Sequence, residues 1–246
     1  MATIVIDPGH TGSYNPGVCI GYYEGNTMLK LAQFLGTALN ALGAAVRYTR
    51  TDNSQNPTLT ERGRMAAGAD LFISLHSDAS DNPLTRGVTS YNSVQRPMSV
   101  PFADAIGEAA AGAMGNQFRG TIARPSETTP GVDFYGVLRA AEATGVLHAF
   151  LIEHGFHTNQ QDCELLSNPD VLTRIAQAEA EVIVYELDLS QSDGCGFVYT
   201  VQPGENLYSI SVKLGISWQE IAYVNGIVEP YFVMSGQELL IPQACR

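Results

Sequence analysis

The sequence predicts an α/β domain whose mainly parallel, twisted sheet is flanked by helices, followed by a small α+β module of βααβ order. Apolar, strand-like runs alternate with amphipathic helical patterns through residues 1–187. A polar, glycine-bearing stretch without periodicity then interrupts the pattern at residues 188–196. Signals for strand, helix, helix and strand follow within residues 197–246. We therefore expect a first domain over 1–187, a linker over 188–196 and a module over 197–246.

The composition supports two packed domains and excludes some partners. With 246 residues, of which 45% are hydrophobic, the chain can bury a core in each domain. Its net charge is -12, so its surface should repel phosphate backbones and anionic bilayers. No apolar run has the length of a membrane-spanning helix, and residues 1–7 lack the basic region and cleavage site of a signal peptide. We expect no nucleic-acid partner and no membrane insertion.

The first elements bring polar residues to strand ends. A β-branched run at 3–6 ends in a Pro-Gly turn, so His10 follows the exit of a predicted strand. Leucines at helical spacing come next, with Asn26 as the predicted N-cap, Gly43 as the terminator and Glu24 just before the helix. Further elements are predicted as a strand at 46–49, a helix at 59–67, a strand at 71–75, a helix at 102–114, a strand at 146–152 and a helix at 171–186.

His76 and Glu153 directly follow two of these strands. Because the carboxyl ends of parallel strands meet at one edge of a sheet, both should lie near His10. Two imidazoles and one carboxylate suit Zn²⁺ and leave a fourth position for water, and His10, Glu24 and His76 can supply that set. Glu153, kept off the metal, could accept and return the proton of that water.

Each of these residues also has a commonplace interpretation. A histidine in a loop is usually a hydrogen-bonded surface residue, and an acidic residue before a helix is favoured by the helix dipole. His157 stands four residues after Glu153, but Gly155 and Phe156 favour a turn over a helix there. We interpret His148 as a structural residue and Cys19 as a free buried thiol.

Four motifs resemble, in order, those of zinc-dependent N-acetylmuramoyl-L-alanine amidases. They are Ile-Asp-Pro-Gly-His-Thr-Gly at 6–12, Glu24, Leu-Phe-Ile-Ser-Leu-His-Ser-Asp-Ala at 71–79, and Leu-Ile-Glu-His-Gly-Phe-His-Thr-Asn at 151–159. The resemblance covers about residues 1–187. It implies that His10, Glu24 and His76 are the zinc ligands and that Glu153 is the catalytic acid-base.

Three further points concern the same resemblance. Thr11 departs from it, because a second glycine is common at that position. The adjoining Glu61 and Arg62 also resemble a family feature, although we interpret them first as a pair on a helix surface. The glycine- and proline-punctuated segment 115–134 is predicted to be a loop that could line the substrate groove.

The module is predicted to form strands at 197–201 and 238–242 around helices at 207–213 and 217–223. Tyr-Thr-Val-Gln-Pro-Gly-Glu-Asn-Leu-Tyr-Ser-Ile at 199–210, Asn-Gly at 225–226 and Ser-Gly-Gln-Glu-Leu-Leu-Ile-Pro at 235–242 resemble a LysM domain. The resemblance implies binding of glycan that contains N-acetylglucosamine, with contacts from Gly204, Glu205, Asn206, Leu207, Gly226 and Ile227. Turn and cap chemistry would explain Gly204 and Asn206 equally well.

The cysteines do not form a metal knuckle. Cys19, Cys163, Cys195 and Cys245 lack the paired Cys-x-x-Cys spacing. Cys195 and Cys245 flank the module, so both a disulfide between them and free thiols stay open.

Taken with the resemblance, these patterns predict a hydrolase. We expect zinc-activated water to cleave the amide between N-acetylmuramic acid and L-alanine in bacterial peptidoglycan, with the LysM module anchoring the enzyme to the wall glycan. An endolysin or autolysin would fit, made in the cytoplasm and released by lysis or through a pore, or else exported by a signal since removed. Two alternatives stay open: another zinc hydrolase of the wall, either a peptidase or a deacetylase, and a non-catalytic glycan-binding or amidase-activating protein.

Overall fold

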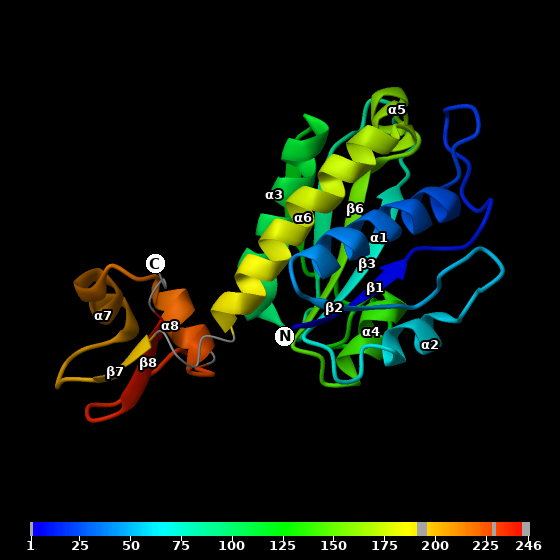
Figure 1. Cartoon of the computed structure of the whole chain (residues 1–246). Coiled ribbons are helices and arrows are strands. Elements are labelled where there is room, and N and C mark those ends of the chain that lie inside the picture. Colours follow the sequence, from blue (N-terminus) through cyan, green and yellow to red (C-terminus); the bar gives the residue numbers. More distant parts are fainter. Residues whose placement is uncertain (1, 191–195, 228–229, 243–246) are drawn as a thin grey trace. The chain divides into compact units, whose positions relative to one another are not determined.

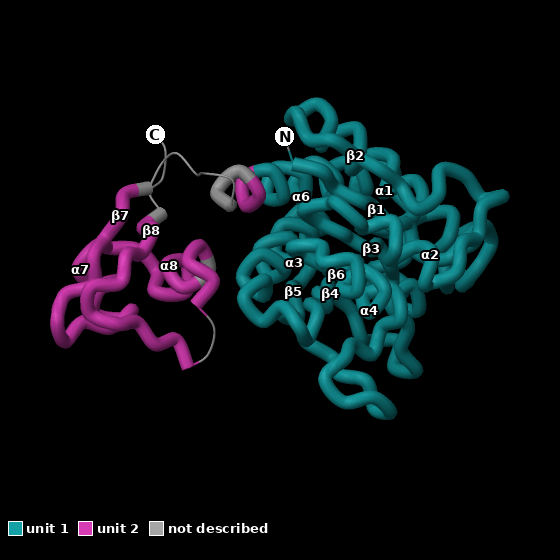
Figure 2. Tube along the Cα trace, turned by 90° about the horizontal axis from the view of Figure 1, so that it is seen from below, with its two compact units in different colours: residues 1–184 teal, residues 185–246 magenta. Residues whose placement is uncertain are grey.

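The chain forms two compact units, Met1–Val184 and Tyr185–Arg246 (Figure 2). The structure, a computed structural model, describes residues 2–190, 196–227 and 230–242. Each unit contains its own sheet.

The first unit is built on a six-stranded sheet of order β2-β1-β3-β6-β4-β5. Strands β2, β1, β3 and β6 run parallel, β4 is antiparallel to β6, and β5 is parallel to β4. This confirms the mainly parallel sheet. The strands are β1(Thr3–Pro8), β2(Ala45–Tyr48), β3(Leu71–Asp78), β4(Val88–Asn92), β5(Phe118–Ile122) and β6(His148–Phe156).

Helices cover both faces of this sheet (Figure 1). One face packs against α1(Glu24–Ala41), α3(Val100–Met114) and α6(Pro169–Ser190), and the other against α2(Leu59–Arg64) and α4(Gly136–Glu142). The core on the α2 and α4 side comes from alternate residues of three strands together with α4 and the turn that follows α2, among them Val5, Phe72, Leu151, Ala66 and Leu138. Because side chains alternate along each strand, the polar residues that continue this series beyond the core lie on the same face, at the carboxyl ends of the strands.

Several predicted boundaries differ from the observed ones. Helix α1 begins at Glu24 with Tyr23 as its N-cap, so Asn26 is not the cap. Helix α6 continues through Ser190, beyond residue 187 and into the segment predicted as a linker. The segment 115–134, predicted as a loop, contains β5, whose mixed sequence Phe-Arg-Gly-Thr-Ile gives no apolar run to find. Strand β4 was missed for the same reason, because Thr89, Ser90 and Asn92 interrupt it.

The second unit pairs β7(Gly196–Thr200) antiparallel with β8(Glu238–Pro242) and carries α7(Leu207–Leu214) and α8(Trp218–Val224). This is the predicted βααβ order. Gly215 ends α7 with a φ of 70°, a backbone region that glycine adopts without strain. Val201, Leu207, Ile210, Ile221 and Leu239 are buried and form the core of this unit.

Cys195 and Cys245, the two cysteines that flank the module, lie outside the described residues, so a disulfide between them stays a prediction. Across the part of the chain that the structure describes, no helix is both long and apolar enough to cross a lipid bilayer.

Gly63 and Gly112 have different surroundings, which predict opposite effects of a Gly→Ala substitution on stability. Gly63 lies where α2 packs closely on α4. At Gly63 an added Cβ would lie 2.5 Å from the Cβ of Ala140 and 2.6 Å from the backbone nitrogen of Ala141. We expect Gly63→Ala to lower the free energy of unfolding by about 2 kcal/mol. Gly112 in α3 faces open space, so Gly112→Ala should raise it by up to about 1 kcal/mol. Urea unfolding of both variants tests this, and equal effects would contradict the packing.

Candidate active site

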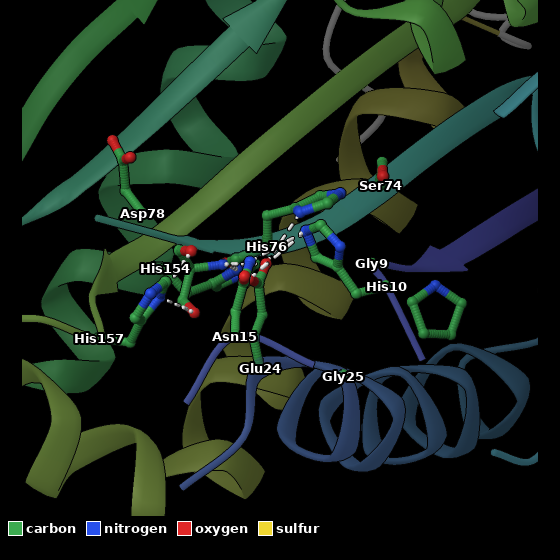
Figure 3. Close-up of polar contacts among 12 residues, drawn as sticks. Gly9, His10, Asn15, Glu24, Gly25, Ser74, His76, Asp78, His154 and His157 are labelled. Carbon is green, nitrogen blue, oxygen red and sulfur yellow. Dashed lines mark hydrogen bonds and ion pairs between the residues drawn. The ribbon is translucent and has the colours of Figure 1, made fainter. Parts of the chain in front are cut away.

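Two histidines and a glutamate converge at the carboxyl edge of β1 and β3 (Figure 3). His10 follows β1, Glu24 is the first residue of α1, and His76 lies within β3. The ligand-capable atoms of the three side chains lie within 4.8 Å of one another. Nδ1 of His76 is 2.9 Å from Oε1 of Glu24, and Nε2 of His10 is 3.5 Å from Oε2 of the same carboxylate. The structure therefore brings together the three residues predicted as metal ligands.

This donor set fits a zinc ion. Bond lengths of about 2.0–2.1 Å in a tetrahedral site place neighbouring ligand atoms about 3.3 Å apart, close to both measured separations. Two nitrogens and one oxygen are ligands that zinc accepts, and three ligands leave one tetrahedral position for a water molecule or substrate. Among the described residues no other group of this kind is found.

The turn that carries His10 is strained, and two buried arginines hold it. His10 has a φ of 54°, which is uncommon for a residue with a side chain. The guanidinium of Arg62 donates to the carbonyls of Pro8 at 2.8 Å and His10 at 3.0 Å. That of Arg50 donates to the carbonyl of Gly9 at 3.1 Å. These hydrogen bonds fix three successive carbonyls that sheet pairing alone would leave without donors.

Close backbone approach explains the glycines around His10. A Cβ on Gly9 would lie 2.5 Å from Cε1 of His76, and a Cβ on Gly25 would lie 2.6 Å from the backbone of Thr11. Any other residue at either position would displace the loop or an imidazole.

Glu24 is held by donors on both oxygens. Its Oε1 accepts from the backbone nitrogen of Ser77 at 3.1 Å, and its Oε2 accepts from Nδ2 of Asn15 at 2.7 Å. Although burial raises the pKa of Glu24, the hydrogen bond and charge of His76 and the charge of His10 outweigh it and bring the value to about 2. The carboxylate is therefore ionised across the working range of any ordinary enzyme.

The pKa values of His76 and His10 are shifted in opposite directions. Burial lowers the pKa of His76, but its hydrogen bond and charge interaction with Glu24 raise it overall to about 9. For His10, burial is the largest cause and the pKa is lowered. In the metal-free protein a proton on His76 therefore occupies the position that a metal ion would take, and metal binding must release it.

Glu153 lies beside His76 in the sheet. The two residues are direct register partners between the parallel strands β3 and β6, so their side chains leave the same face. Burial raises the pKa of Glu153 to about 8, with smaller contributions from the charges of Glu24 and Asp78. Its Oε2 is buried and has no hydrogen-bond partner among the described residues. Such a carboxyl group can hold or release a proton near neutral pH.

The alternation of β6 turns His154 to the opposite face. Its Nδ1 donates to the backbone carbonyl of His76 at 3.1 Å, and its Nε2 lies 2.8 Å from Oε1 of Glu179 on α6. His157 follows the strand, and its Nδ1 lies 3.0 Å from the hydroxyl of Ser77. The helical pairing of Glu153 with His157 is thus absent, as expected from the turn residues.

Other sequence interpretations can be compared with their surroundings. His148 is buried, and its Nδ1 is 2.9 Å from the hydroxyl of Ser99, which agrees with a structural role. The interpretation of Glu61 and Arg62 as a pair on a helix surface is wrong. Arg62 is buried and pairs with Asp7 at 3.2 Å, whereas Glu61 accepts from the backbone nitrogen of Thr58 in a capping box.

Asn15 and Arg50 were missed from the sequence, and the position of Arg62 was misjudged. Asn15 reaches Glu24 only because its loop folds back, and no local pattern shows this. Arg50 had a usable signal, since it stands two residues beyond the end of β2 at the edge where ligand sites gather. The family resemblance pointed to Arg62, but nothing in the sequence showed that its side chain is buried.

In the second unit, the predicted glycan contacts divide into structural and accessible residues. The Glu205 carboxylate accepts from the hydroxyl of Tyr199 and from Nζ of Lys213, and Asn206 caps α7. Leu207 is buried, whereas Gly226 is exposed and Ile227 is partly exposed. A surface hollow is lined by Asn206, Leu207, Tyr208, Trp218 and Tyr231. Its three aromatic residues, Tyr208, Trp218 and Tyr231, are not among the predicted contacts.

Comparisons with known proteins agree with the division of the chain into two units. A family profile described as N-acetylmuramoyl-L-alanine amidase matches residues 4–185, and a LysM domain profile matches residues 199–242. The N-acetylmuramoyl-L-alanine amidase LytC of Bacillus subtilis strain 168 is 31% identical over 180 residues, which make up 72% of this chain and 34% of LytC. The probable cell wall amidase LytH of Staphylococcus epidermidis is 40% identical over 92 residues, 36% of this chain and 30% of LytH. The chain thus spans about a third of the length of these relatives.

Solved structures show the same fold. The catalytic domain of the amidase CwlV from Bacillus (Paenibacillus) polymyxa var. colistinus superposes with a TM-score of 0.66 at 27% identity, over 76% of this chain and 99% of that domain. An N-acetylmuramoyl-L-alanine amidase of Clostridium difficile 630 has a TM-score of 0.66 at 23% identity over 78% of this chain and 98% of its own, a likeness of fold. With the family profile covering residues 4–185, the chain belongs to the N-acetylmuramoyl-L-alanine amidase family and carries a LysM domain after it.

Proposed function

We propose that this chain is a zinc-dependent amidase that hydrolyses the amide between N-acetylmuramic acid and L-alanine in bacterial peptidoglycan. The observation that carries the proposal is the juxtaposition of His10, Glu24 and His76 with Glu153, a buried carboxyl group in register with one of them. The activity named for LytC and for CwlV supports the same reaction.

His10, Glu24 and His76 would hold the zinc ion. When bound, zinc supplies Lewis acidity, which acidifies a water molecule and polarises the carbonyl of the amide. Asn15 and the Ser77 amide orient the Glu24 carboxylate, and the His154 imidazole fixes the backbone of His76 from behind. Partners of this kind align ligands before the ion arrives.

Glu153 would move the proton. Its carboxylate accepts a proton from the attacking water and returns it to the departing L-alanine nitrogen, which leaves only as an amine. Both transfers need a group whose two protonation states are close in free energy, and burial gives Glu153 a pKa of about 8 in the metal-free protein. The charge of a bound cation would lower this value and favour the carboxylate that begins the cycle.

The LysM domain would anchor the enzyme to wall glycan. Its hollow combines Tyr208, Trp218 and Tyr231, and aromatic faces suit the apolar faces of sugar rings. Peptidoglycan is insoluble, so a tether raises the local concentration of cleavable amides near the active site. The protein would then act at the bacterial cell wall as an endolysin or autolysin.

Replacing Glu153 should separate proton transfer from metal binding. Glu153→Gln keeps the shape of the side chain but cannot accept a proton, so kcat should fall by about 10²–10⁴-fold while one zinc ion stays bound. Zinc content by atomic absorption and mass spectrometry of released muropeptides measure both quantities. Glu108→Gln, at an exposed position on α3, is the matched control and should retain full activity.

Product analysis separates the alternatives. An amidase releases peptides that begin with L-alanine and creates no new reducing ends. A deacetylase would release acetate, a peptidase would cut within the stem peptide, and a non-catalytic binder would release nothing. Near-normal turnover by Glu153→Gln would contradict the assignment of the proton carrier even if the product were the expected one.

The raised pKa of Glu153 should make the stability of the metal-free protein depend on pH. Because burial raises the pKa of Glu153 from 4.5 to about 8, the folded protein keeps a proton that the unfolded chain loses within this window. The folded state then binds more protons, so this group makes the free energy of unfolding fall as pH rises from 4.5 to about 8. Urea unfolding with a chelator should show that Glu153→Gln lacks this contribution. Parallel curves for wild type and variant would contradict the raised pKa.

The aromatic residues that line the hollow in the LysM domain should contribute to glycan binding. In a Glu153→Gln background, which leaves the wall intact, Tyr208→Ala and Trp218→Ala should each weaken binding to insoluble peptidoglycan by several-fold to about tenfold in Kd. Val212→Ala is the control, because Val212 is exposed on α7, the helix of Tyr208, but does not line the hollow. Co-sedimentation measures binding, and an equal loss in all three variants would indicate a general effect on folding instead.

A further inference from the structure

Two cysteines from distant parts of the chain meet beside the catalytic edge. Cys163 lies in the first turn of α5(Gln160–Ser167) and is fully buried, whereas Cys19 lies in the loop between β1 and α1 and is partly exposed. The backbone nitrogen of Cys19 donates to Sγ of Cys163 at 3.1 Å, and the two side chains are in hydrogen-bond contact. Neither sulfur belongs to the cluster of His10, Glu24 and His76.

The backbone around both sulfurs is already held in place. A Cβ on Gly17 would lie 2.9 Å from Sγ of Cys163, so the loop packs directly on this thiol. The nitrogen of Val18 donates to the carbonyl of His157 at 3.0 Å, and Pro16 and Tyr23 form a β-bridge that closes the loop on itself. A disulfide needs close Cα atoms and sulfurs about 2.05 Å apart. Because the two segments are already in contact, forming the disulfide here calls for rotation of the side chains.

We propose that Cys19 and Cys163 form an oxidation site that a low-molecular-weight disulfide of the glutathione class converts into an intramolecular disulfide. The partly exposed Cys19 thiolate attacks one sulfur of the small disulfide, which forms a mixed disulfide and expels one small thiolate. The Cys163 thiolate then attacks Sγ of Cys19 and expels the second. The two cysteines lose two electrons, the small disulfide gains them, and the two cysteine protons end on the two released thiols.

The surroundings assign the order of the two cysteines. Burial raises the pKa of the Cys163 thiol, so this residue is the resolving partner and closure accelerates at mildly alkaline pH. Its burial also shields it from direct attack by a small disulfide in solution.

The bond would brace the loop that serves the metal cluster. This loop positions Asn15, which donates to Glu24 at 2.7 Å, and Tyr22, whose hydroxyl donates to Ser77 at 2.8 Å. A disulfide would link it covalently to α5, which follows the strand of Glu153. The thiols would persist in a reducing cytosol, and the bond would form once the protein reached an oxidising exterior.

The test uses the full chain with Cys195→Ser and Cys245→Ser, so that only this pair can react. The protein is incubated with oxidised glutathione at mildly alkaline pH, quenched with acid, alkylated in denaturant, digested and mapped by mass spectrometry. We expect a linked peptide pair containing Cys19 and Cys163, lighter by two hydrogens than the separate thiol peptides. Dithiothreitol should restore two alkylatable thiols.

Thermal unfolding provides a second readout. Because the bond would join residues 144 positions apart, the oxidised form should melt several °C above the reduced form. Cys19→Ser is the matched control and should give no linked peptides, no rise in Tm and an unmodified Cys163. The proposal is overturned if both thiols stay alkylatable, if Cys19 carries glutathione while Cys163 stays free, or if the linked form melts lower than the reduced one.

Discussion

The carboxylate of Glu24 connects the parts of this site. Its two oxygens contact the imidazoles of His76 and His10, and they accept hydrogen bonds from the amide of Ser77 and the side chain of Asn15. A buried charge of this kind is stable only when such partners surround it. The strained turn at His10, the small residues at 9 and 25, and the early start of α1 all serve this convergence.

Two glutamates a short distance apart acquire opposite properties from their surroundings. Glu24 is surrounded by donors and has a pKa of about 2, whereas Glu153 is buried with one oxygen unpartnered and has a pKa of about 8. This separation supports the proposal that one carboxylate binds a cation and the other transfers a proton. The buried guanidiniums of Arg50 and Arg62 support both roles indirectly, because they fix the backbone of the β1 exit without entering the cluster.

The LysM domain shows how a few polar residues can define a surface while serving the fold. Glu205 links Tyr199 and Lys213, and Asn206 begins α7, so both organise the edge of the aromatic hollow from within. Sugar recognition would then rest on the rings of Tyr208, Trp218 and Tyr231, which line the hollow together with Asn206 and Leu207. Such recognition suits an acidic protein, since neutral glycan offers no charge to repel it.

The sequence by itself determined the alternation of strands and helices, the βααβ module and the four residues at strand ends and helix start that now lie together. Those inferences rest on local periodicity and on motif resemblance, which depend only on neighbouring residues. The tertiary structure alone decided that His76 and Glu153 share a register, that β4 and β5 extend the sheet, and that Arg62 is buried against Asp7. It also brought Asn15 to Glu24 and Cys19 to Cys163. Burial and pairing across long stretches of chain set these relations, and no local pattern encodes them, because the partner of each residue is chosen by packing.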